Sequence, residues 1–344
     1  MRLDVLIPSL NRGPLLERAL RSVLRAVRPA ELDLRITVIL NGSTDDSAAR
    51  IHALSQDAPG TIGIVHERRR GKSRALNAGI AATSGEVVAM IDDDEEVDRG
   101  WLTEIVRVFA DPSVDFAGGP YVAVWATPAP PWVPPDYLAV VGSAENGEVE
   151  REYGRDFPGI LKGGNAVIRR RTLLAAGPYA EYLGPARGAR LFSCEDEEMY
   201  WRLIEMGARG RYVPSMIIYH HVLPGRLTPG YYRRWCFWRG VSRGLMDHRH
   251  PLRVPYLAGV PRFLFGRAAH GMAGIARRAL GEAPHPSRAL ADELSVLDLT
   301  GYWFGRHIYT LARFSPVRNR RHPSGTFVVP PQPPAPQPLT KASA

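Results

Sequence analysis

The stretch VVAMIDDDEEV, residues 87–97, places an apolar run directly before a run of acids. Val87–Ile91 has the composition of a buried strand, and Asp92, Asp93 and Asp94 follow it without a break. On an extended segment alternate side chains share a face, so we expect Asp92 and Asp94 to point together. Two such carboxylates form a hard-oxygen site of the kind that Mg²⁺ or Mn²⁺ occupies together with phosphate oxygens. A solvated acidic turn is the other interpretation, and the buried run before the acids argues against it.

Upstream of this stretch, strand-like and helix-like segments alternate. The β-rich apolar segments are residues 3–7, 34–40 and 62–66, and the helix-like ones are residues 14–27, 45–55 and 73–82. Such alternation predicts parallel βαβ units. A polar cluster follows each of the four strands, at residues 9–12, 41–46, 68–72 and 92–96. Because ligands bind at the carboxyl ends of the strands in such sheets, we expect an α/β fold with its site at that edge.

Residues 68–72, Arg-Arg-Arg-Gly-Lys, precede one of the predicted helices. Basic side chains together with free helix N–H groups suit a diphosphate, and a solvated basic turn is the alternative. The first strand is not followed by GxGxxG, and the chain contains no GxxxxGK[ST]. These absences argue against a nicotinamide dehydrogenase and a P-loop NTPase.

The composition of the 344 residues, 45% hydrophobic and 23% charged, is that of a globular protein. It excludes collagen-like, coiled-coil and wholly disordered chains. Two cysteines, Cys194 and Cys236, are too few for a disulfide framework or a four-ligand zinc site, which favours a reducing compartment. We find no apolar run of about 18 residues for a membrane span. Pro8 interrupts the apolar N-terminus, which argues against a signal peptide. We therefore expect a cytoplasmic protein.

The net charge of +9 is unevenly distributed. Residues 1–208 contain 24 Lys and Arg against 30 Asp and Glu, a net of −6, whereas residues 209–344 carry +15. In the second part arginines alternate with large aromatics, as at Trp235, Trp238 and Arg239, which suits the interface of an anionic bilayer. A helical subdomain with solvated arginines explains the pattern equally well. Nucleic-acid binding is disfavoured because the arginines lie among apolar residues and no known module is present.

A second acidic cluster, Glu-Asp-Glu-Glu at residues 195–198, begins a predicted helix that ends at Gly207. Acids are favourable at a helix N-terminus, so capping is one explanation of the cluster. The other is that one carboxylate serves as a general base. We expect Glu197 to face solvent. His220 and His221 close a predicted strand, where a buried histidine is more often structural than a metal ligand.

Six segments, taken together, resemble the family-two glycosyltransferases, a group that uses nucleotide sugars and has the GT-A fold. They are VLIPSLNR (5–12), NGSTDDSA (41–48), RRRGKSRALNAGIAATSGEVVAMIDDDEEVDRGWL (68–102), GGNAVIRRRTLLAAGPYAEYLG (163–184), CEDEEMYWRLIEMGARGRYVP (194–214) and YHHVLPGRLT (219–228). Each is a modest match, but six in the family's order are specific. The resemblance implies a Rossmann-like, mixed and mostly parallel sheet flanked by helices, with a helical C-terminal extension. It implies a catalytic domain over residues 1–228. The pattern and composition of the remaining sequence predict a basic, aromatic helical region over 229–321 and a proline-rich, disordered tail over 322–344.

The resemblance also implies a reaction: transfer of a sugar from a nucleotide-diphosphate sugar, typically a UDP-sugar, to a hydroxyl of a glycan or lipid-linked saccharide. Such enzymes use Mg²⁺ or Mn²⁺ and invert the anomeric configuration. The residues implied to bind the donor are Pro8, Ser9, Asn11, Arg12, Asn41, Gly71, Lys72, Asn77, Asp92 and Asp93. The implied metal ligands are Asp92, Asp94 and His220. The family's usual aspartate, which binds the base, is Asn41 here, so the identity of the base is less certain.

On the acceptor side the resemblance implies that Asp196 is the general base, with Glu195 beside it and Glu198 as the second candidate. The residues implied to face the acceptor are Gly163, Gly164, Asn165 and Trp132. Trp132 lies in a proline-rich loop over residues 125–158, where it would either stack on a sugar ring or staple the loop. The basic region over 229–321 is a candidate for peripheral contact with an anionic membrane.

Two other classes of protein remain as alternatives. A nucleotide-sugar pyrophosphorylase shares a related sheet, but it would carry a glycine-rich, lysine-bearing loop near the first strand, which residues 7–12 (IPSLNR) do not supply. A catalytically silent protein that binds sugar nucleotides or membranes on the same fold is disfavoured because both acidic clusters are intact.

Overall fold

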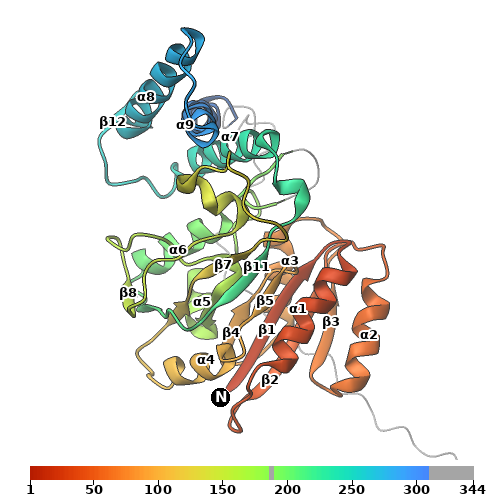
Figure 1. Cartoon of the computed structure of the whole chain (residues 1–344). Helices are drawn as coiled ribbons and strands as arrows, with labels where there is room; N and C mark the ends of the chain where they lie inside the picture. Colours follow the sequence, from red (N-terminus) through yellow and green to blue (C-terminus); the bar gives the residue numbers. More distant parts are fainter. Residues whose placement is uncertain (186–189, 310–344) are drawn as a thin grey trace, which may run out of the picture.

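The computed structural model describes residues 1–185 and 190–309. The strands of its main sheet are β1 (Arg2–Ser9), β2 (Asp33–Leu40), β3 (Ile62–His66), β4 (Val87–Met90), β6 (Phe116–Gly118), β8 (Arg151–Tyr153), β9 (Ala166–Arg169) and β10 (Gly210–Tyr212). Their order is β3-β2-β1-β4-β9-β6-β10-β8 (Figure 1). The first four strands in this order are mutually parallel, whereas β9 is antiparallel to β4 and β6, and β8 to β10. The prediction of a mixed, mostly parallel sheet is confirmed.

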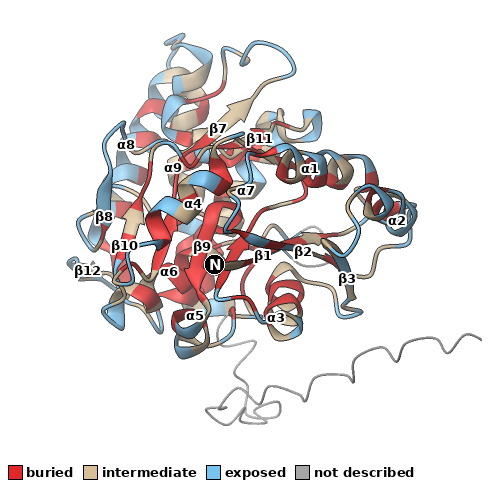
Figure 2. Ribbon diagram, turned by 90° about the horizontal axis from the view of Figure 1, so that it is seen from below, coloured by how far each residue is buried: buried red, intermediate tan, exposed pale blue. Residues whose placement is uncertain are grey.

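Helices cover both faces of this sheet, and its central strands β4, β6 and β9 are buried between them (Figure 2). The helices are α1 (Gly13–Arg25), α2 (Ser47–Asp57), α3 (Lys72–Ala82), α4 (Trp101–Phe109), α5 (Arg170–Ala176) and α6 (Glu195–Glu205). Side chains alternate along β1, so Leu3, Val5 and Ile7 join the core under α1, α2 and α4. Leu6 joins the core under α3, α5 and α6. Burial on both faces explains why the parallel strands are continuously apolar in sequence.

A second, three-stranded sheet has the order β5-β11-β7 and consists of β5 (Glu95–Val97), β7 (Tyr121–Val124) and β11 (Ile218–His221). β11 is antiparallel to β5, with His220 opposite Glu95. This pairing brings a histidine next to the acidic stretch after β4. The β-rich run that the sequence predicts over residues 213–221 forms a strand only at Ile218–His221, because the chain turns at Pro214, which has no N–H to continue a ladder.

The C-terminal part consists of α7 (Pro229–Met246), α8 (Arg262–Ala279) and α9 (Pro286–Trp303). Short elements complete the described chain: β12 (Tyr256–Leu257), β13 (Val260–Pro261), η1 (Pro135–Val141), η2 (Gly163–Asn165), η3 (Pro224–Arg226) and η4 (Phe304–Tyr309). Helices α7 and α9 pack closely at glycines. A Cβ on Gly240 would lie 2.5 Å from the Asp298 carbonyl oxygen, and one on Gly301 would overlap the Phe237 carbonyl oxygen.

Helix α8 projects from the body of the molecule (Figure 1). One stripe of it is buried, including Leu264 and Ala268, whereas Phe263 and Met272 are exposed. None of the helices in the described ranges is both long and apolar enough to span a membrane. The domain division at residue 228 stays a prediction. The predicted tail over 322–344, and residues 310–321 of the basic region, lie outside the described residues.

Candidate active site

The loops after β1, β2 and β4 meet in a cleft of about 1020 Å³. The predicted site residues that line it are Pro8, Ser9, Arg12, Asn41, Gly71, Lys72, Asp92, Asp93, Asp94, Glu195, Asp196 and His220. The predicted residues that do not line it are Asn11, Asn77, Trp132, Gly163, Gly164, Asn165 and Glu198. The cleft lies at the carboxyl ends of the parallel strands, as the positions of the polar clusters indicate.

The first acidic cluster is not extended, so the premise that Asp92 and Asp94 share a strand face is wrong. β4 ends at Met90, and the chain turns at residues 93–94. The carboxylates therefore diverge to different partners. Asp92 accepts a hydrogen bond from Lys72 Nζ at 2.6 Å, on the side of the cleft formed by α3.

The two following aspartates share an arginine. Asp93 is buried and accepts hydrogen bonds from the Ser9 hydroxyl at 2.7 Å and from Arg12 at 2.9 Å. Burial raises the pKa of Asp93 to about 6 against the attraction of Arg12. Asp94 is also buried, but Arg226 at 2.8 Å and Arg12 at 3.1 Å outweigh the effect of burial and hold its pKa below the usual value. Asp94 is therefore the firmly ionised acid of this pair.

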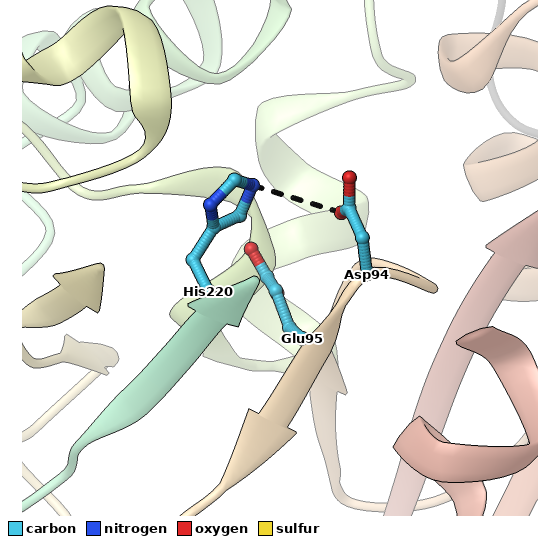
Figure 3. Close-up of side chains that lie close together, drawn as sticks. All are labelled: Asp94, Glu95 and His220. Carbon is cyan, nitrogen blue, oxygen red and sulfur yellow. Dashed lines mark ion pairs between the residues drawn. The ribbon is translucent and has the colours of Figure 1, made fainter. Parts of the chain in front are cut away.

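Asp94, Glu95 and His220 form a group in which one ligand atom of each lies within 4.8 Å of the others (Figure 3). Asp94 Oδ1 is 3.8 Å from His220 Nε2. Burial lowers the pKa of His220, which favours the neutral imidazole that a metal needs. Glu95 Oε1 is buried without a hydrogen-bond partner. Two carboxylates, one of them with a free buried oxygen, and a neutral imidazole fit a divalent cation.

The sequence interpretation did not include Glu95. Its Oε2 accepts a hydrogen bond from the Asp92 backbone N–H at 2.7 Å, and its burial raises its pKa well above the usual value. Asp92, which was predicted as a metal ligand, is not a member of the grouped residues. The sequence shows only that Glu95 continues the acidic run, and the pairing of its strand with that of His220 is visible only in the structure.

Asn41 shapes the basic loop that precedes α3. Its Oδ1 accepts the Gly71 N–H at 2.7 Å, and its Nδ2 donates to the carbonyl oxygens of Glu67 at 3.1 Å and Arg69 at 2.9 Å. A carboxylate could not donate to those two carbonyls, so the amide suits this loop better than the family's usual aspartate. Gly71 has φ of +140°, a conformation that side chains rarely adopt.

Lys72, the first residue of α3, joins the two acidic clusters. Its Nζ is 2.5 Å from Asp92 Oδ1 and 3.7 Å from Glu195 Oε1. Burial alone would lower the pKa of Lys72, but these carboxylates raise it well above its usual value. The lysine is therefore a permanent cation in the middle of the cleft.

Asp196 differs from its three acidic neighbours on α6 because it is only half-buried, whereas the others are buried. Its Oδ1 accepts the Glu197 N–H at 2.9 Å and its Oδ2 accepts the Gly163 N–H at 3.2 Å. These bonds orient a carboxylate that still lines the cleft. Beside it, burial raises the pKa of Glu195 to about 7.

The next two acids of α6 form structural ion pairs. The expectation that Glu197 faces solvent is wrong: it is buried, Arg243 lies at 3.0 Å, and its pKa is lowered to about 2 because the arginine outweighs burial. Glu198 is buried against Arg202 at 2.7 Å and His250 at 3.3 Å, outside the cleft lining. The geometry therefore favours Asp196 over Glu198 as the residue that faces an acceptor.

Gly163 and Gly164, which were predicted on the acceptor side, each pack against an acidic side chain. A Cβ on Gly163 would lie 3.1 Å from the Asp196 Cβ, and one on Gly164 would overlap the Glu95 carboxylate. Both sites need a residue without a side chain for the acids to take these positions. Their contribution in this structure is to position carboxylates.

Asn165 and Trp132 are engaged inside the protein. Asn165 accepts a hydrogen bond from the Trp101 indole at 3.0 Å and donates to the Met216 carbonyl at 2.7 Å. Trp132 packs edge-on against Tyr232, with ring centroids 5.3 Å apart. This contact anchors the loop, and the role of Trp132 in facing the acceptor stays a prediction.

Two asparagines predicted on the donor side hold the chain around the cleft. Asn77 donates to the Tyr179 carbonyl at 3.0 Å and accepts the Tyr179 N–H at 2.8 Å. Asn11 has a left-handed φ of 53° and accepts the Thr44 N–H at 2.7 Å. Both side chains tie loops together next to the residues that line the cleft.

Helix α7 forms a wall of the cleft, and the contact of residues 229–321 with an anionic membrane stays a prediction. Trp235, Arg239 and Arg243 line the cleft, and Tyr232 is fully buried. Arg239 lies over the Trp235 ring at 5.4 Å. The alternation of basic and aromatic residues here builds an inward-facing surface, which periodicity alone does not distinguish from an outward-facing one.

Comparisons with known proteins agree with this geometry. Residues 4–170 match the model described as glycosyl transferase family 2. An uncharacterized glycosyltransferase of Nostoc sp. is 38% identical over 109 residues, 32% of this chain and 33% of the relative. A glucosyl-dolichyl phosphate glucuronosyltransferase of Haloferax volcanii is 25% identical over 226 residues, 63% of this chain and 69% of the relative.

A solved structure shares the fold over most of the chain. The mannosyltransferase PcManGT of Pyrobaculum calidifontis, in complex with GDP-Man and Mn²⁺, has a TM-score of 0.57 at 19% identity, covering 88% of this chain and 86% of that one. The match establishes the GT-A architecture. With the ordered motifs, these findings show that residues 4–170 belong to glycosyl transferase family 2 and that the protein is a glycosyltransferase.

Proposed function

We propose that the protein transfers a sugar from a UDP-sugar to a hydroxyl of a glycan or lipid-linked saccharide, with a divalent cation and inversion at the anomeric carbon. The observation that carries the proposal is that one cleft contains both the acids around Asp94 and the half-buried Asp196. Lys72 lies between the two clusters. Opposed sites for a leaving diphosphate and an attacking hydroxyl are what a single displacement requires.

The donor side of the cleft suits a nucleoside diphosphate. The loop that Asn41 holds ends at the N-terminus of α3, where the helix dipole and Lys72 favour an anion. The choice of UDP rests on the family resemblance. The similar mannosyltransferase was solved with GDP-Man, so both classes of donor belong in the test.

Asp94, Glu95 and His220 would hold the cation. When bound, a divalent cation acts as a Lewis acid that offsets the negative charge growing on the leaving diphosphate. Lys72 supplies a further positive charge, because the carboxylates around it keep it protonated. The chain therefore concentrates positive charge on one side of the reacting sugar.

Asp196 would accept the proton of the acceptor hydroxyl. It lies in the first turn of α6, and the N–H groups of Gly163 and Glu197 fix its orientation. Attack from the side of Asp196, with the diphosphate leaving on the side of Asp94, would invert the configuration of the sugar. Among the four acids of α6, Asp196 alone is not buried.

The acceptor side is rich in cations. Arg155, Lys162 and Arg239 line the cleft together with Trp235 and Trp201. Charges of this kind suit an acceptor that bears a phosphate, and the rings suit a sugar. The name of the Haloferax relative, which acts on a glucosyl-dolichyl phosphate, agrees with a lipid-linked acceptor.

A lipid-linked acceptor would require contact with a membrane, and we propose α8 for that contact. Phe263, Met272 and Ile275 are exposed on it, and Leu280 follows it, 87% exposed. Arginines accompany these side chains on the same helix at 262, 267, 277 and 278. Apolar and basic side chains on one projecting helix match the interface of an anionic bilayer.

The test is donor turnover without a known acceptor. Purified protein is incubated with UDP- and GDP-sugars, with Mn²⁺, Mg²⁺ or EDTA, and nucleoside diphosphate release is followed while NMR records the first anomer of the freed sugar. We expect release with one donor, its loss in EDTA, and an inverted anomer. A retained anomer would overturn the mechanism. Binding of a donor without any turnover would favour the silent sugar-nucleotide-binding protein.

A further inference from the structure

Arg226 lies between two of the candidate metal ligands. It ends η3, the turn that follows β11, and it lines the cleft. Its Nη1 is 3.0 Å from His220 Nε2, and its Nη2 donates to Asp94 Oδ2 at 2.8 Å. The guanidinium therefore bridges the imidazole and the carboxylate that the candidate metal group contains.

The same ligand set cannot serve the arginine and a metal together. A guanidinium can only donate, so His220 Nε2 faces it with its lone pair, and a cation would need that lone pair. A guanidinium and a divalent cation held by the same two side chains would also repel each other strongly at this separation. One positive charge must leave when the other arrives.

Asp94 keeps a partner if Arg226 leaves, because Arg12 also contacts it, at 3.1 Å. The turn that carries Arg226 has room to move: Pro224 and Gly225 are exposed, and a Cβ on Gly225 would meet nothing within 4 Å. Release of the arginine therefore disturbs little of the surrounding packing.

We propose that Arg226 is a positioning residue that occupies the metal site of the free enzyme and is displaced by the cation. The proposal rests on the metal site of the proposed function. Once released, the arginine remains on a turn that lines the same cleft and can pair with the diphosphate of the donor. Binding of the cation and of the nucleotide diphosphate would then reinforce each other, because each makes the other's ligands available.

The experiment measures Mn²⁺ binding directly, by the EPR signal of the free ion, on the full chain with and without UDP. We expect Arg226→Met to bind Mn²⁺ alone about tenfold more tightly than wild type, within the usual range of such couplings. UDP should tighten Mn²⁺ binding less in Arg226→Met than in wild type. Arg226→Gln serves as a second variant if the first fails to fold, as judged by circular dichroism.

Arg233→Met is the matched control, because Arg233 is exposed on α7 and pairs with Glu293. It removes the same charge and should leave Mn²⁺ affinity unchanged. Unchanged or weaker Mn²⁺ binding in Arg226→Met, with Asp94→Asn weaker than wild type, would overturn the role of Arg226 alone. If Asp94→Asn binds Mn²⁺ as well as wild type, the metal site itself is wrong.

Discussion

Single residues of the same type take different roles in this cleft according to what surrounds them. Glu197 and Glu198 form ion pairs with arginines, and Glu198 also contacts a histidine. Glu195 is buried and its pKa is raised, whereas Asp196 is half-buried and lines the cleft. A general base must be ionised and must reach the substrate. The surroundings of the four acids, more than their residue type, therefore support the proposal that Asp196 is the base.

Replacement of Asp196 tests that selection. Asp196→Asn keeps the size of the side chain and an oxygen for the Gly163 N–H, but an amide cannot take a proton. General-base catalysis contributes roughly 10²–10⁴-fold, so we expect the rate of transfer to fall by about that factor while donor affinity changes little. Steady-state transfer rates and calorimetric titration of the donor measure the two quantities.

Glu198→Gln is the matched control for this experiment. It removes an acid of the same helix that pairs with Arg202 outside the cleft lining, so we expect lower stability with transfer near the wild-type rate. A dead Glu198→Gln beside an active Asp196→Asn would reassign the base to Glu198. Activity in both variants would refute the inverting mechanism proposed above.

At the scale of elements, the position of α7 depends on its contact with α9. The backbone of α7 approaches Gly301 so closely that a Cβ there would overlap the Phe237 carbonyl oxygen. Because backbone atoms cannot rotate away as a side chain does, Gly301→Ala should separate the helices. We expect a loss of roughly 1–3 kcal/mol in the free energy of unfolding, the usual cost of overpacking.

Gly266→Ala provides the comparison for that variant. Gly266 lies inside α8 with nothing within 4 Å of its Cβ position, so alanine there should leave stability unchanged or raise it slightly through helix propensity. Urea denaturation followed by circular dichroism measures both variants. Equal stabilities of Gly301→Ala and wild type would show that the two helices do not need this close contact.

His250, which follows α7, contacts two acidic side chains of α6. Its Nε2 is 3.3 Å from Glu198 Oε1 and its Nδ1 is 3.0 Å from Glu205 Oε2. Hydrogen bonding to Glu198, above all, raises the pKa of His250 against the effect of burial. The folded protein therefore favours the imidazolium.

Because of these contacts of His250, we expect the free energy of unfolding to depend on pH. A group whose pKa is raised on folding stabilises most below its unfolded pKa, about 6.5 for histidine, and the gain disappears as pH rises through the higher folded value. Glu198, with a lowered pKa, stays ionised over this range. Between about pH 6 and pH 8.5 we expect the free energy of unfolding of wild type to fall more than that of His250→Gln. Parallel pH dependence in urea titrations would contradict this.

In the whole molecule, the N-terminal and C-terminal parts of the chain carry net charges of opposite sign. The net charge of residues 1–208 is −6 and that of residues 209–344 is +15. Several of the large exposed apolar side chains in the described ranges lie on or next to α8, the element that projects from the body (Figure 1). An anionic membrane would attract the basic C-terminal part, which includes α8, and repel the acidic N-terminal part.

Flotation on liposomes tests this orientation. We expect wild type to float with vesicles of anionic lipid more than with neutral ones, and less at high salt, because screening weakens surface electrostatics. The double variant Met272→Glu with Leu280→Glu should lose most of that binding. Val27→Glu, at an exposed apolar residue remote in sequence from α8, controls for added acid. Equal flotation with neutral and anionic lipid would rule out the proposed contact.

The parallel half of the main sheet and the edge at which the site lies could be predicted from the sequence. These features follow from local patterns: the apolar runs of β1, β2 and β4, the helices between them, and polar residues where each strand ends. Such patterns are legible because these strands are largely apolar and the helices that pack on them are adjacent in sequence. The ordered motifs added the family and the candidate residues.

Which acids are free and which are paired depends on tertiary contacts. Glu95 lies next to His220 because β5 pairs with β11, and Arg243 from α7 balances the charge of the buried Glu197. Likewise Arg226 reaches Asp94 from a turn far along the chain. Spacing in sequence carries no information about such contacts, because burial and charge pairing depend on elements that meet only when the chain is folded.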